Sequence, residues 1–323
     1  MFGTHRKNDF YGMEDMEEIH VYLTGRLGNQ LFQYAFARNL QKQYGGKIVC
    51  NTFDLDHRSE KSKVADEKFS YAMAGFNLDS NVVLEDDAMP WYADFCYPAI
   101  KVIKHMAPRQ YFDFMAKRGY LMWQRSDYVS IPRLESNKVY AWGWWQDVRY
   151  FHDVQKELSD EIVPVTAPLN ENQYIYDAAG DEESVCISIR CGNYFNPTVK
   201  KLLYVCTPQY FYDSIDCISK RLAHPKFIVF TDDIDWVKDN LKFENNYPQY
   251  DFIYERGCDT VEEKIRMMSM CSHFIISNST FSWWAQFLSK NDDKIVIAPD
   301  RWFVDGRRTG LYMDGWTLVP AGQ

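Results

Sequence analysis

Short apolar segments alternate with helical segments through the second half of the chain, and this alternation limits the fold more than any other feature. The segments follow one another as Val185–Arg190, Thr207–Leu222, Lys226–Thr231, Ile234–Leu241, Asp251–Tyr254, Thr260–Cys271, His273–Ser277, Thr280–Leu288 and Lys294–Ala298. Strands that alternate with helices in this way form a mostly parallel sheet with helices on both faces. The pattern predicts a doubly wound, Rossmann-like α/β domain over residues 184–323.

The beginning of the chain predicts a second α/β domain. An apolar strand at Ile19–Leu23 runs through a glycine-containing loop into a helix at Asn29–Tyr44, and another strand follows at Lys47–Asn51. The helix carries apolar residues at helical spacing and is stopped by a pair of glycines. We expect this N-terminal domain to span residues 19–160.

The remaining segments are less regular. We expect residues 105–127 to be largely helical, residues 139–145 to form a strand and residues 146–158 to form a helix. Residues 161–183 contain proline, glycine and several acids among few apolar residues, which predicts a linker between the domains. Residues 1–18 are polar and predict a flexible N-terminal extension.

Charge and cysteine content exclude several classes of protein. The net charge of −9 disfavours nucleic acid as the main partner, because such partners require clustered Lys and Arg. We expect no membrane span, because no run of about 18 apolar residues occurs. The polar start of the sequence lacks the apolar core of a signal peptide. The eight cysteines form no CxxC pair, which favours reduced thiols over disulfides or zinc ligands. These features predict a cytoplasmic location.

Polar residues follow four of the predicted strands, and ligands of such sheets bind at the carboxyl ends of the strands. The first group is Gly25–Gln30, whose glycines let backbone N–H groups approach an anion at a helix start. Arg190 ends the second strand and can pair with a phosphate. Asp232 and Asp233 follow the third, and the hydroxyl-rich run Ser277–Ser282 follows the fourth. Together the four groups describe a diphosphate pocket with carboxylates for a ribose or a base.

Each group also has an alternative interpretation. The glycines can form an ordinary turn, Arg190 a surface salt bridge, and the Asp, Ser and Thr residues helix caps. Asp233 and Asp235 also match the DxD site of metal-dependent glycosyltransferases, which would bind Mg²⁺ or Mn²⁺. The glycines lack the GxGxxG spacing of a nicotinamide site. The residues alone therefore predict a nucleotide-binding α/β enzyme, and they do not identify its reaction.

Five segments resemble signatures of the family 11 α-1,2-fucosyltransferases. GRLGNQLFQYAFAR (Gly25–Arg38) resembles GGLGNQ(M/L)FQYA, and GWWQDVRYF (Gly143–Phe151) is similar to GYWQSxKYF. SIRCGNY (Ser188–Tyr194) resembles HxRRGDY, and FTDDIDW (Phe230–Trp236) resembles F(S/T)DDxxW. MSMCSHFIISNSTFSWWAQFL (Met268–Leu288) resembles MSxCxHxIxxNSTFSWWxAxL. The matches follow the order of the family and span residues 19–316.

The resemblance implies a GT-B-type fold, with two Rossmann-like lobes and a deep interdomain cleft. It implies an inverting α-1,2-fucosyltransferase that moves L-fucose from GDP-fucose to the 2-hydroxyl of a terminal galactose, without a metal or another cofactor. The N-terminal domain would face the acceptor, and the C-terminal domain would bind GDP-fucose. The acceptor, an oligosaccharide or an O-antigen unit, stays open. A lipid-linked acceptor would bring the protein to the inner face of the membrane.

The positions that match the family signatures imply which residues form the site. The resemblance assigns Arg190 and Asn193 to the catalytic site, with Arg190 on the diphosphate. The predicted donor-binding residues are Arg26, Gly28, Asn29, Gln30, Asp232, Asp233, Ser277, Asn278, Ser279, Thr280, Phe281 and Ser282. We expect the acceptor to enter near Trp144, Trp145 and Gln146.

Four residues depart from the family pattern. Ser188 stands in place of His, Cys191 in place of the second Arg, Asn193 in place of Asp, and Arg26 in place of a glycine. An amide cannot act as a general base, so the base lies elsewhere or the reaction needs little base assistance. We hypothesise that Arg26 compensates for the cation missing at Cys191. A sugar-binding protein without turnover is the alternative that Asn193 and the many Trp and Tyr residues leave open.

Overall fold

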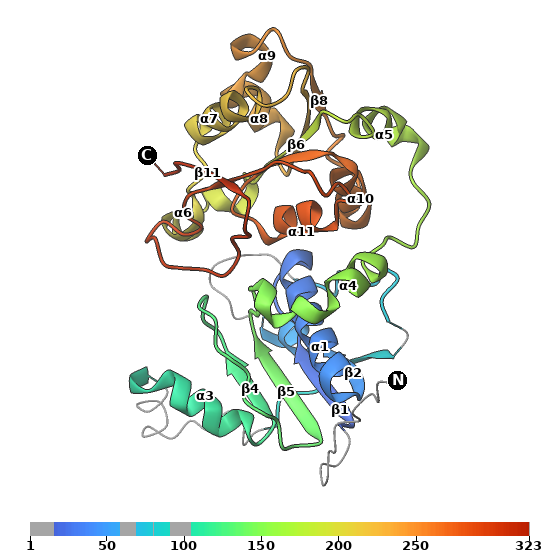
Figure 1. The fold of residues 1–323 in the computed structure, drawn as a ribbon, viewed down its shortest axis with the longest axis vertical. Coiled ribbons are helices and arrows are strands. Elements are labelled where there is room, and N and C mark those ends of the chain that lie inside the picture. Colours follow the sequence, from blue (N-terminus) through green and yellow to red (C-terminus); the bar gives the residue numbers. More distant parts are fainter. Residues whose placement is uncertain (1–15, 59–68, 80, 91–104, 323) are drawn as a thin grey trace, which may run out of the picture.

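A computed structural model describes residues 16–58, 69–79, 81–90 and 105–322, without the side chains of Asp56, Arg58 and Asn193. Two α/β lobes lie one above the other (Figure 1). Most of the predicted N-terminal extension, residues 1–15, lies outside the described residues. The part that is described is ordered into the fold, since Met16 is buried and Glu18 begins the first strand.

The N-terminal lobe contains a parallel sheet with the strand order β3-β2-β1-β5-β4. Its strands are β1 (Glu18–Tyr22), β2 (Lys47–Asn51), β3 (Val82–Glu85), β4 (Tyr120–Trp123) and β5 (Lys138–Gly143). The helical segments of this lobe are α1 (Leu27–Tyr44), η1 (Asp54–Arg58), α3 (Pro108–Ala116), η4 (Val148–Tyr150), η5 (His152–Val154) and α4 (Gln155–Glu161). Helix α1 packs on β1 and β2, and α3 packs on β4.

The C-terminal lobe contains a second parallel sheet with the order β11-β10-β9-β6-β7-β8. Its strands are β6 (Ser184–Ile189), β7 (Lys226–Thr231), β8 (Phe252–Tyr254), β9 (His273–Ile276), β10 (Val296–Pro299) and β11 (Thr317–Val319). Its helical segments are η6 (Asn170–Asn172), α5 (Gln173–Ala179), η7 (Gly192–Phe195), α6 (Pro197–Leu203), α7 (Pro208–Ile218), α8 (Ile234–Leu241), α9 (Phe243–Asn246), α10 (Val261–Met270) and α11 (Thr280–Leu288). The sheet is covered on both faces, as the alternating pattern predicts.

Strand β6 shows why this sheet is doubly covered. All of its residues are buried. Val185, Ile187 and Ile189 face a core shared with α7 and α8, whereas Cys186 belongs to the core shared with α10 and α11. Because side chains of a strand alternate between the two faces, both faces of β6 are buried, and the hydroxyls of Ser184 and Ser188 on the Cys186 side are hydrogen-bonded to Ala179 and Ser282.

One hydrophobic core runs through both lobes. Phe32 of α1 contacts the rings of Trp283 and Trp284 of α11, with centroids 4.8 and 5.1 Å apart. The indole N–H of Trp284 donates to the carbonyl of Gly28 at 3.0 Å, so the aromatic contact is also fixed by a hydrogen bond. Both tryptophans are fully buried. The Trp-Trp pair of the family signature therefore builds the contact between the lobes.

Most predicted elements of the C-terminal lobe are confirmed, and the differences lie mainly in the N-terminal lobe. Residues 105–127 are not largely helical: α3 ends at Ala116, and β4 follows. Residues 146–158 form two short 3-10 turns before α4 rather than one helix. The predicted helix at 207–222 ends at Ile218. The predicted linker includes η6 and α5, and α5 packs against β6 and β7.

Two further features of the described part bear on the predictions. No helix in it is both long and apolar enough to cross a membrane. Its cysteines carry free thiols, and Cys96 lies outside it.

Candidate functional site

A cavity of about 1130 Å³ lies between the lobes. Its walls include residues at or after the ends of β1, β4 and β5 of the N-terminal sheet and of β6, β7, β9 and β10 of the C-terminal sheet, together with residues of α10. Because all strand pairs in each sheet are parallel, these ends lie on one edge of each sheet, and the two edges face each other. This volume is ample for a nucleotide-sized ligand.

The cavity adjoins the point in each sheet where the strand order reverses. In the C-terminal sheet this point lies between β6 and β9, and in the N-terminal sheet between β1 and β5. Arg190 and Ser279 line the cavity at the first point, whereas Asn29 and Trp144 line it at the second. Open α/β sheets bind ligands at such switch points. The fold therefore offers two ligand-binding positions within one cavity.

Two helix N-termini meet at the cavity. The N-cap residues Arg26 of α1 and Ser279 of α11 make no side-chain capping hydrogen bond, and neither helix has an acidic residue in its first turn. Gly28 brings the helices together: a Cβ atom there would lie 2.6 Å from the backbone nitrogen of Phe281 and from Oγ1 of Thr280. Uncapped N–H groups and the positive ends of two helices make this an anion-binding region.

Arg190 and Asp232 form an ion pair beside this region. Asp232 Oδ1 also accepts from the backbone N–H of Cys191 at 2.7 Å. Burial raises the pKa of Asp232, while that N–H group and the charge of Arg26 act in the opposite direction. Gly192 is required here, because a Cβ atom would lie 2.3 Å from Asp232 Oδ2. The ion pair with Asp232 thus holds the Arg190 guanidinium at the cavity wall, where it can face an anionic ligand.

A hydroxyl cluster lies beneath the start of α11. The hydroxyl groups of Ser188 and Ser282 are 2.6 Å apart, and those of Ser277 and Ser282 are 3.5 Å apart. Next to them, the Asn278 amide donates to the carbonyls of Leu203 and Trp302, each at 2.8 Å. Asn278 therefore ties three loops together, and the serines support the helix start.

Asn29 connects the lobes at the cavity. Its Oδ1 accepts from Gln146 Nε2 and from Thr280 Oγ1, each at 3.0 Å. Gly25, with φ of +73°, makes room for it, since a Cβ atom there would lie 2.4 Å from Asn29 Nδ2. The predicted glycine loop therefore positions an amide that holds one residue of each lobe.

The structure brings most of the predicted site residues to the cavity. The predicted residues that line it are Arg26, Gly28, Asn29, Arg190, Asp232, Asn278, Ser279, Thr280, Phe281 and Ser282. Gln30, Asp233 and Ser277 are not among its lining residues. Gln30 Nε2 donates to the carbonyls of Gly25 and Ser70 and so supports the loop. Asp233 caps α8 by accepting from the Trp236 N–H, and it lines a smaller adjoining cavity of about 580 Å³.

Three of the departures from the family pattern, at Asn193, Cys191 and Arg26, also have a place in the structure. The backbone of Asn193 lies in η7, but its side chain lies outside the described part of the structure. Cys191 is buried in the core of the C-terminal lobe and does not line the cavity, and burial raises its pKa to about 12. Arg26 does line the cavity.

Several lining residues were not predicted. They include Gln124–Asp127 after β4, Trp302, Phe303, Arg307 and Arg308 after β10, Asp259 just before α10, and Val261, Lys264 and Met268 along α10. The rule that ligands meet the ends of strands applies to β10 and would have identified Trp302. The end of β4 was missed because the segment was interpreted as helical.

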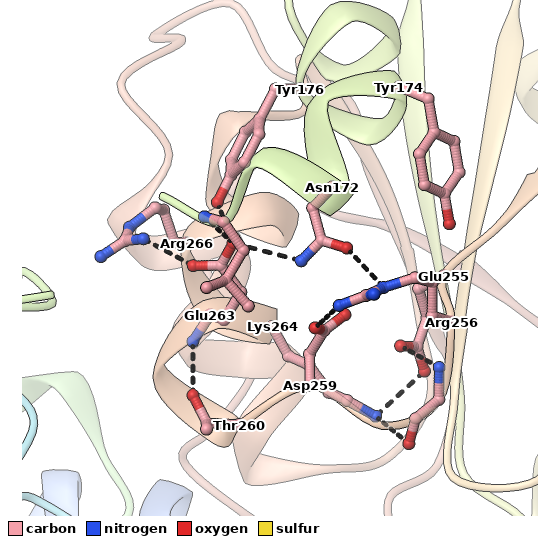
Figure 2. Close-up of polar contacts among 12 residues, drawn as sticks. Asn172, Tyr174, Tyr176, Glu255, Arg256, Asp259, Thr260, Glu263, Lys264 and Arg266 are labelled. Atoms are coloured by element: carbon pink, nitrogen blue, oxygen red, sulfur yellow. Dashed lines mark hydrogen bonds and ion pairs between the residues drawn. The ribbon is translucent and has the colours of Figure 1, made fainter. Parts of the chain in front are cut away.

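Figure 2 shows a polar network that holds the start of α10 against the segment before α5. Glu263 Oε1 accepts from the hydroxyl of Tyr176, the amide of Asn172 and the backbone N–H of Leu169, and Oε2 accepts from Arg266. Burial acts to raise the pKa of Glu263, but these donors together lower it below its ordinary value. The Glu263 carboxylate is therefore charged and fully paired.

The same network leads to the cavity wall. Asn172 Oδ1 accepts from Arg256 Nε at 3.0 Å, and Arg256 donates to Asp259 Oδ1 at 2.7 Å. The Asp259 side chain is only 1% exposed, and its Oδ2 has no hydrogen-bond partner within the described residues. A buried carboxylate oxygen without a partner is costly, so a ligand donor that reached it would be favoured.

No group of three or more His, Cys, Asp or Glu side chains is placed to hold a metal ion in the residues that the structure describes.

Two Rossmann-like lobes whose strand ends face one nucleotide-sized cavity form a GT-B-type fold, as predicted. A solved mutant of Arabidopsis thaliana FUT1 in complex with GDP shares the fold, with a TM-score of 0.51 at 12% identity over 90% of this chain and 72% of that one. The model of glycosyl transferase family 11 matches residues 18–319. The chain belongs to glycosyl transferase family 11.

Two curated proteins of Escherichia coli are similar to the chain. An alpha-1,2-colitosyltransferase is 30% identical over 89% of this chain and 93% of its own length. The O-antigen biosynthesis glycosyltransferase WbnK is 27% identical over 92% of this chain and 99% of its own length.

Proposed function

We propose that this glycosyltransferase transfers L-fucose from GDP-fucose to the 2-hydroxyl of a terminal galactose, with inversion at the anomeric carbon. The observation that carries the proposal is the anion-binding region formed by Arg190 and the two uncapped helix starts, in a chain of family 11. A diphosphate is the part of the donor that such a region fits.

The main barrier of such a transfer is the negative charge that develops on the departing diphosphate. Arg190 and the N–H groups at the starts of α1 and α11 are fixed before the reaction, so they stabilise that charge without reorganising. Each well-placed donor of this kind contributes about 3–4 kcal/mol in the transition state. Early departure of the diphosphate also lowers the demand for a general base, which suits an amide at Asn193.

The nucleoside end of the donor has two supports in this proposal. Asp232 lines both the main cavity and the adjoining smaller one, where its carboxylate can accept from a ribose hydroxyl. Asp259 lines the main cavity, and a side-chain rotation that exposes its buried, unpartnered Oδ2 would let this oxygen accept from the N–H edge of guanine.

We also propose that the reaction needs no metal and that the acceptor is an O-antigen unit. The name of the WbnK relative supports the acceptor class. If the acceptor is lipid-linked, the protein works in the cytoplasm at the inner face of the membrane.

The colitosyltransferase relative favours a second donor, GDP-colitose. Colitose is L-fucose without the 3-hydroxyl, so the same diphosphate site serves both sugars. The two donors differ by one hydrogen bond at the sugar, which a polar site can discriminate strongly.

The test is GDP release by the purified protein with GDP-fucose or GDP-colitose and a panel of galactosides, with and without EDTA. We expect acceptor-dependent release with GDP-fucose that survives EDTA, and an α-1,2 linkage in the product by NMR. Release only with GDP-colitose would establish the second donor. Loss of GDP release in EDTA would instead indicate that Asp233 and Asp235 bind a metal ion that the reaction needs. Tight GDP binding with no release on any acceptor would favour a binding protein.

A further inference from the structure

We infer that Trp144 is the platform on which the acceptor sugar stacks, at the switch point of the N-terminal sheet. The inference rests on the proposed function and deepens it. The ligand class is a neutral hexopyranose with a continuous face of C–H groups, as galactose has on the side opposite its axial hydroxyl. An indole ring packs against such a face through its apolar surface.

Trp144 lies at the switch point of the N-terminal sheet. It follows the end of β5, and β5 lies beside β1 where the strand order of the sheet reverses. The corresponding point of the C-terminal sheet carries Arg190 and the start of α11, which suit an anion. The point in the N-terminal sheet carries the start of α1 after β1, and after β5 it presents an indole beside the amides of Asn29 and Gln146. An indole beside amides suits a neutral, hydroxylated ligand.

The residue after Trp144 has a strained backbone. Trp145 has a φ of +53°, a conformation that costs a bulky residue about 1–2 kcal/mol. Its ring is buried, stacks on Phe36 with centroids 4.0 Å apart, and meets Tyr150 edge-on. Strain of this kind persists where the surrounding structure enforces it, and it gathers at functional sites.

The loop that contains both tryptophans is fixed on either side. The carbonyl of Gly143 accepts from Gln33 Nε2 at 3.1 Å, and a Cβ atom at Gly143 would lie 2.3 Å from the carbonyl of Trp123. The N–H of Asp147 donates to the carbonyl of Trp145 at 3.0 Å. Trp145 is thereby held in the core while Trp144 stays half-buried at the cavity wall.

Trp144 is also the indole that the cavity leaves accessible. The other tryptophan among the described lining residues, Trp302, is only 4% exposed. Gln146, two residues after Trp144, is hydrogen-bonded to Asn29, which holds Thr280 at the start of α11. The platform is therefore tied to the donor end of the cavity, so that a stacked sugar lies within the same enclosure as the reacting carbon.

The experiment compares Trp144→Ala and Trp144→Phe with the wild type. We expect the acceptor KM to rise about tenfold or more in Trp144→Ala and less in Trp144→Phe, which keeps an aromatic ring. The KM for GDP-fucose, the affinity for GDP and the slow hydrolysis of GDP-fucose without acceptor should stay within about twofold of the wild type. Trp142→Phe is the matched control, because Trp142 lies on β5, is half-buried and does not line the cavity.

The outcomes separate this inference from the proposed function. An unchanged acceptor KM in Trp144→Ala, or an equal rise in the donor KM, overturns the platform. If Trp144→Ala does not fold, the acceptor KM of Trp144→Phe is compared with that of Trp142→Phe. A larger rise in Trp144→Phe supports the platform, and an equal value overturns it. If the wild type transfers another sugar, the proposed function fails, and the KM values are then measured with the donor and acceptor that turn over. Without any turnover, saturation-transfer NMR of lactose decides: loss of the lactose signal in Trp144→Ala supports the platform, and an unchanged signal overturns it.

Discussion

The two walls of the cavity are built by different physical means. On the C-terminal wall, Arg190, Asp232 and the start of α11 follow directly from strand ends, and they are held by hydrogen bonds and charge. On the N-terminal wall, Trp144 is held by the buried, strained Trp145 behind it. A charged donor requires fixed electrostatics, whereas a neutral acceptor requires a fixed shape. Substitutions on each wall test that contrast.

Trp145→Ala should have the largest effect, a loss of about 3–5 kcal/mol in the free energy of unfolding, because it empties a buried aromatic site. Denaturant unfolding measures it. Trp145→Gly sharpens the test, because glycine adopts a positive φ without strain. We expect Trp145→Gly to be more stable than Trp145→Ala by about 1 kcal/mol. Equal stability, or a less stable glycine variant, would show that the backbone strain is unimportant.

Arg190→Ala should reduce kcat/KM by about 10²–10³-fold, because a cation fixed beside the departing diphosphate is lost. Arg190→Lys should recover only part of the rate, since an ammonium group cannot pair bidentately with phosphate. Arg125→Ala is the control on the opposite wall, where Arg125 is exposed and paired with Asp127. If Arg125→Ala reduced the rate as much as Arg190→Ala, charge would act through the whole cavity and the contrast between the walls would fail.

Glu263→Gln should cost about 1–3 kcal/mol of stability, because Arg266 would then face an amide in a buried network. The effect should depend on pH. The pKa of Glu263 is lowered in the folded state, so its stabilisation is complete above the ordinary value of 4.5 and is lost as the pH falls through the folded-state value. Urea unfolding of both proteins between pH 7 and pH 3 should therefore show the difference shrinking at the acid end. A constant difference would contradict this account.

Arg26→Ala should have the smallest effect, about a tenfold loss in kcat/KM, or about 1.4 kcal/mol. Arg26 lines the cavity and its charge acts on Asp232, but it belongs to the N-terminal lobe and supplements Arg190 rather than replacing it. Steady-state kinetics with varied GDP-fucose measure the loss. An unchanged rate would refute the hypothesis that Arg26 compensates for Cys191.

The sequence predicts the C-terminal lobe well because its signals are local. The bounds of β7 and α8 agree with the prediction to the residue, since an apolar strand and a capped helix are each visible in a short window. The segment Tyr120–Trp123 was missed because all four residues are buried, so no alternation distinguishes a strand from the end of the preceding helix.

The sequence predicted those site residues that directly follow a strand. It did not predict the contacts between residues that are far apart in the chain. Arg190 and Ser279 were found by their place after strands. The contact of Asn29 with Thr280 joins residues 251 positions apart, which no local pattern reveals. A positive φ at Trp145 is equally invisible, because the sequence there resembles an ordinary strand end. Cys191 appeared as a missing cation, yet its side chain points into the core.

The aromatic contact between α1 and α11 has a consequence for how the protein folds. Neither lobe can be produced alone as a native unit, since each would expose half of a core that contains Phe32, Trp283 and Trp284. Separate expression of the halves should give aggregation-prone chains, whereas co-expression allows the halves to complement each other. By the same reasoning the intact chain melts as one cooperative unit, and a calorimetric trace contains a single transition in spite of the two sheets.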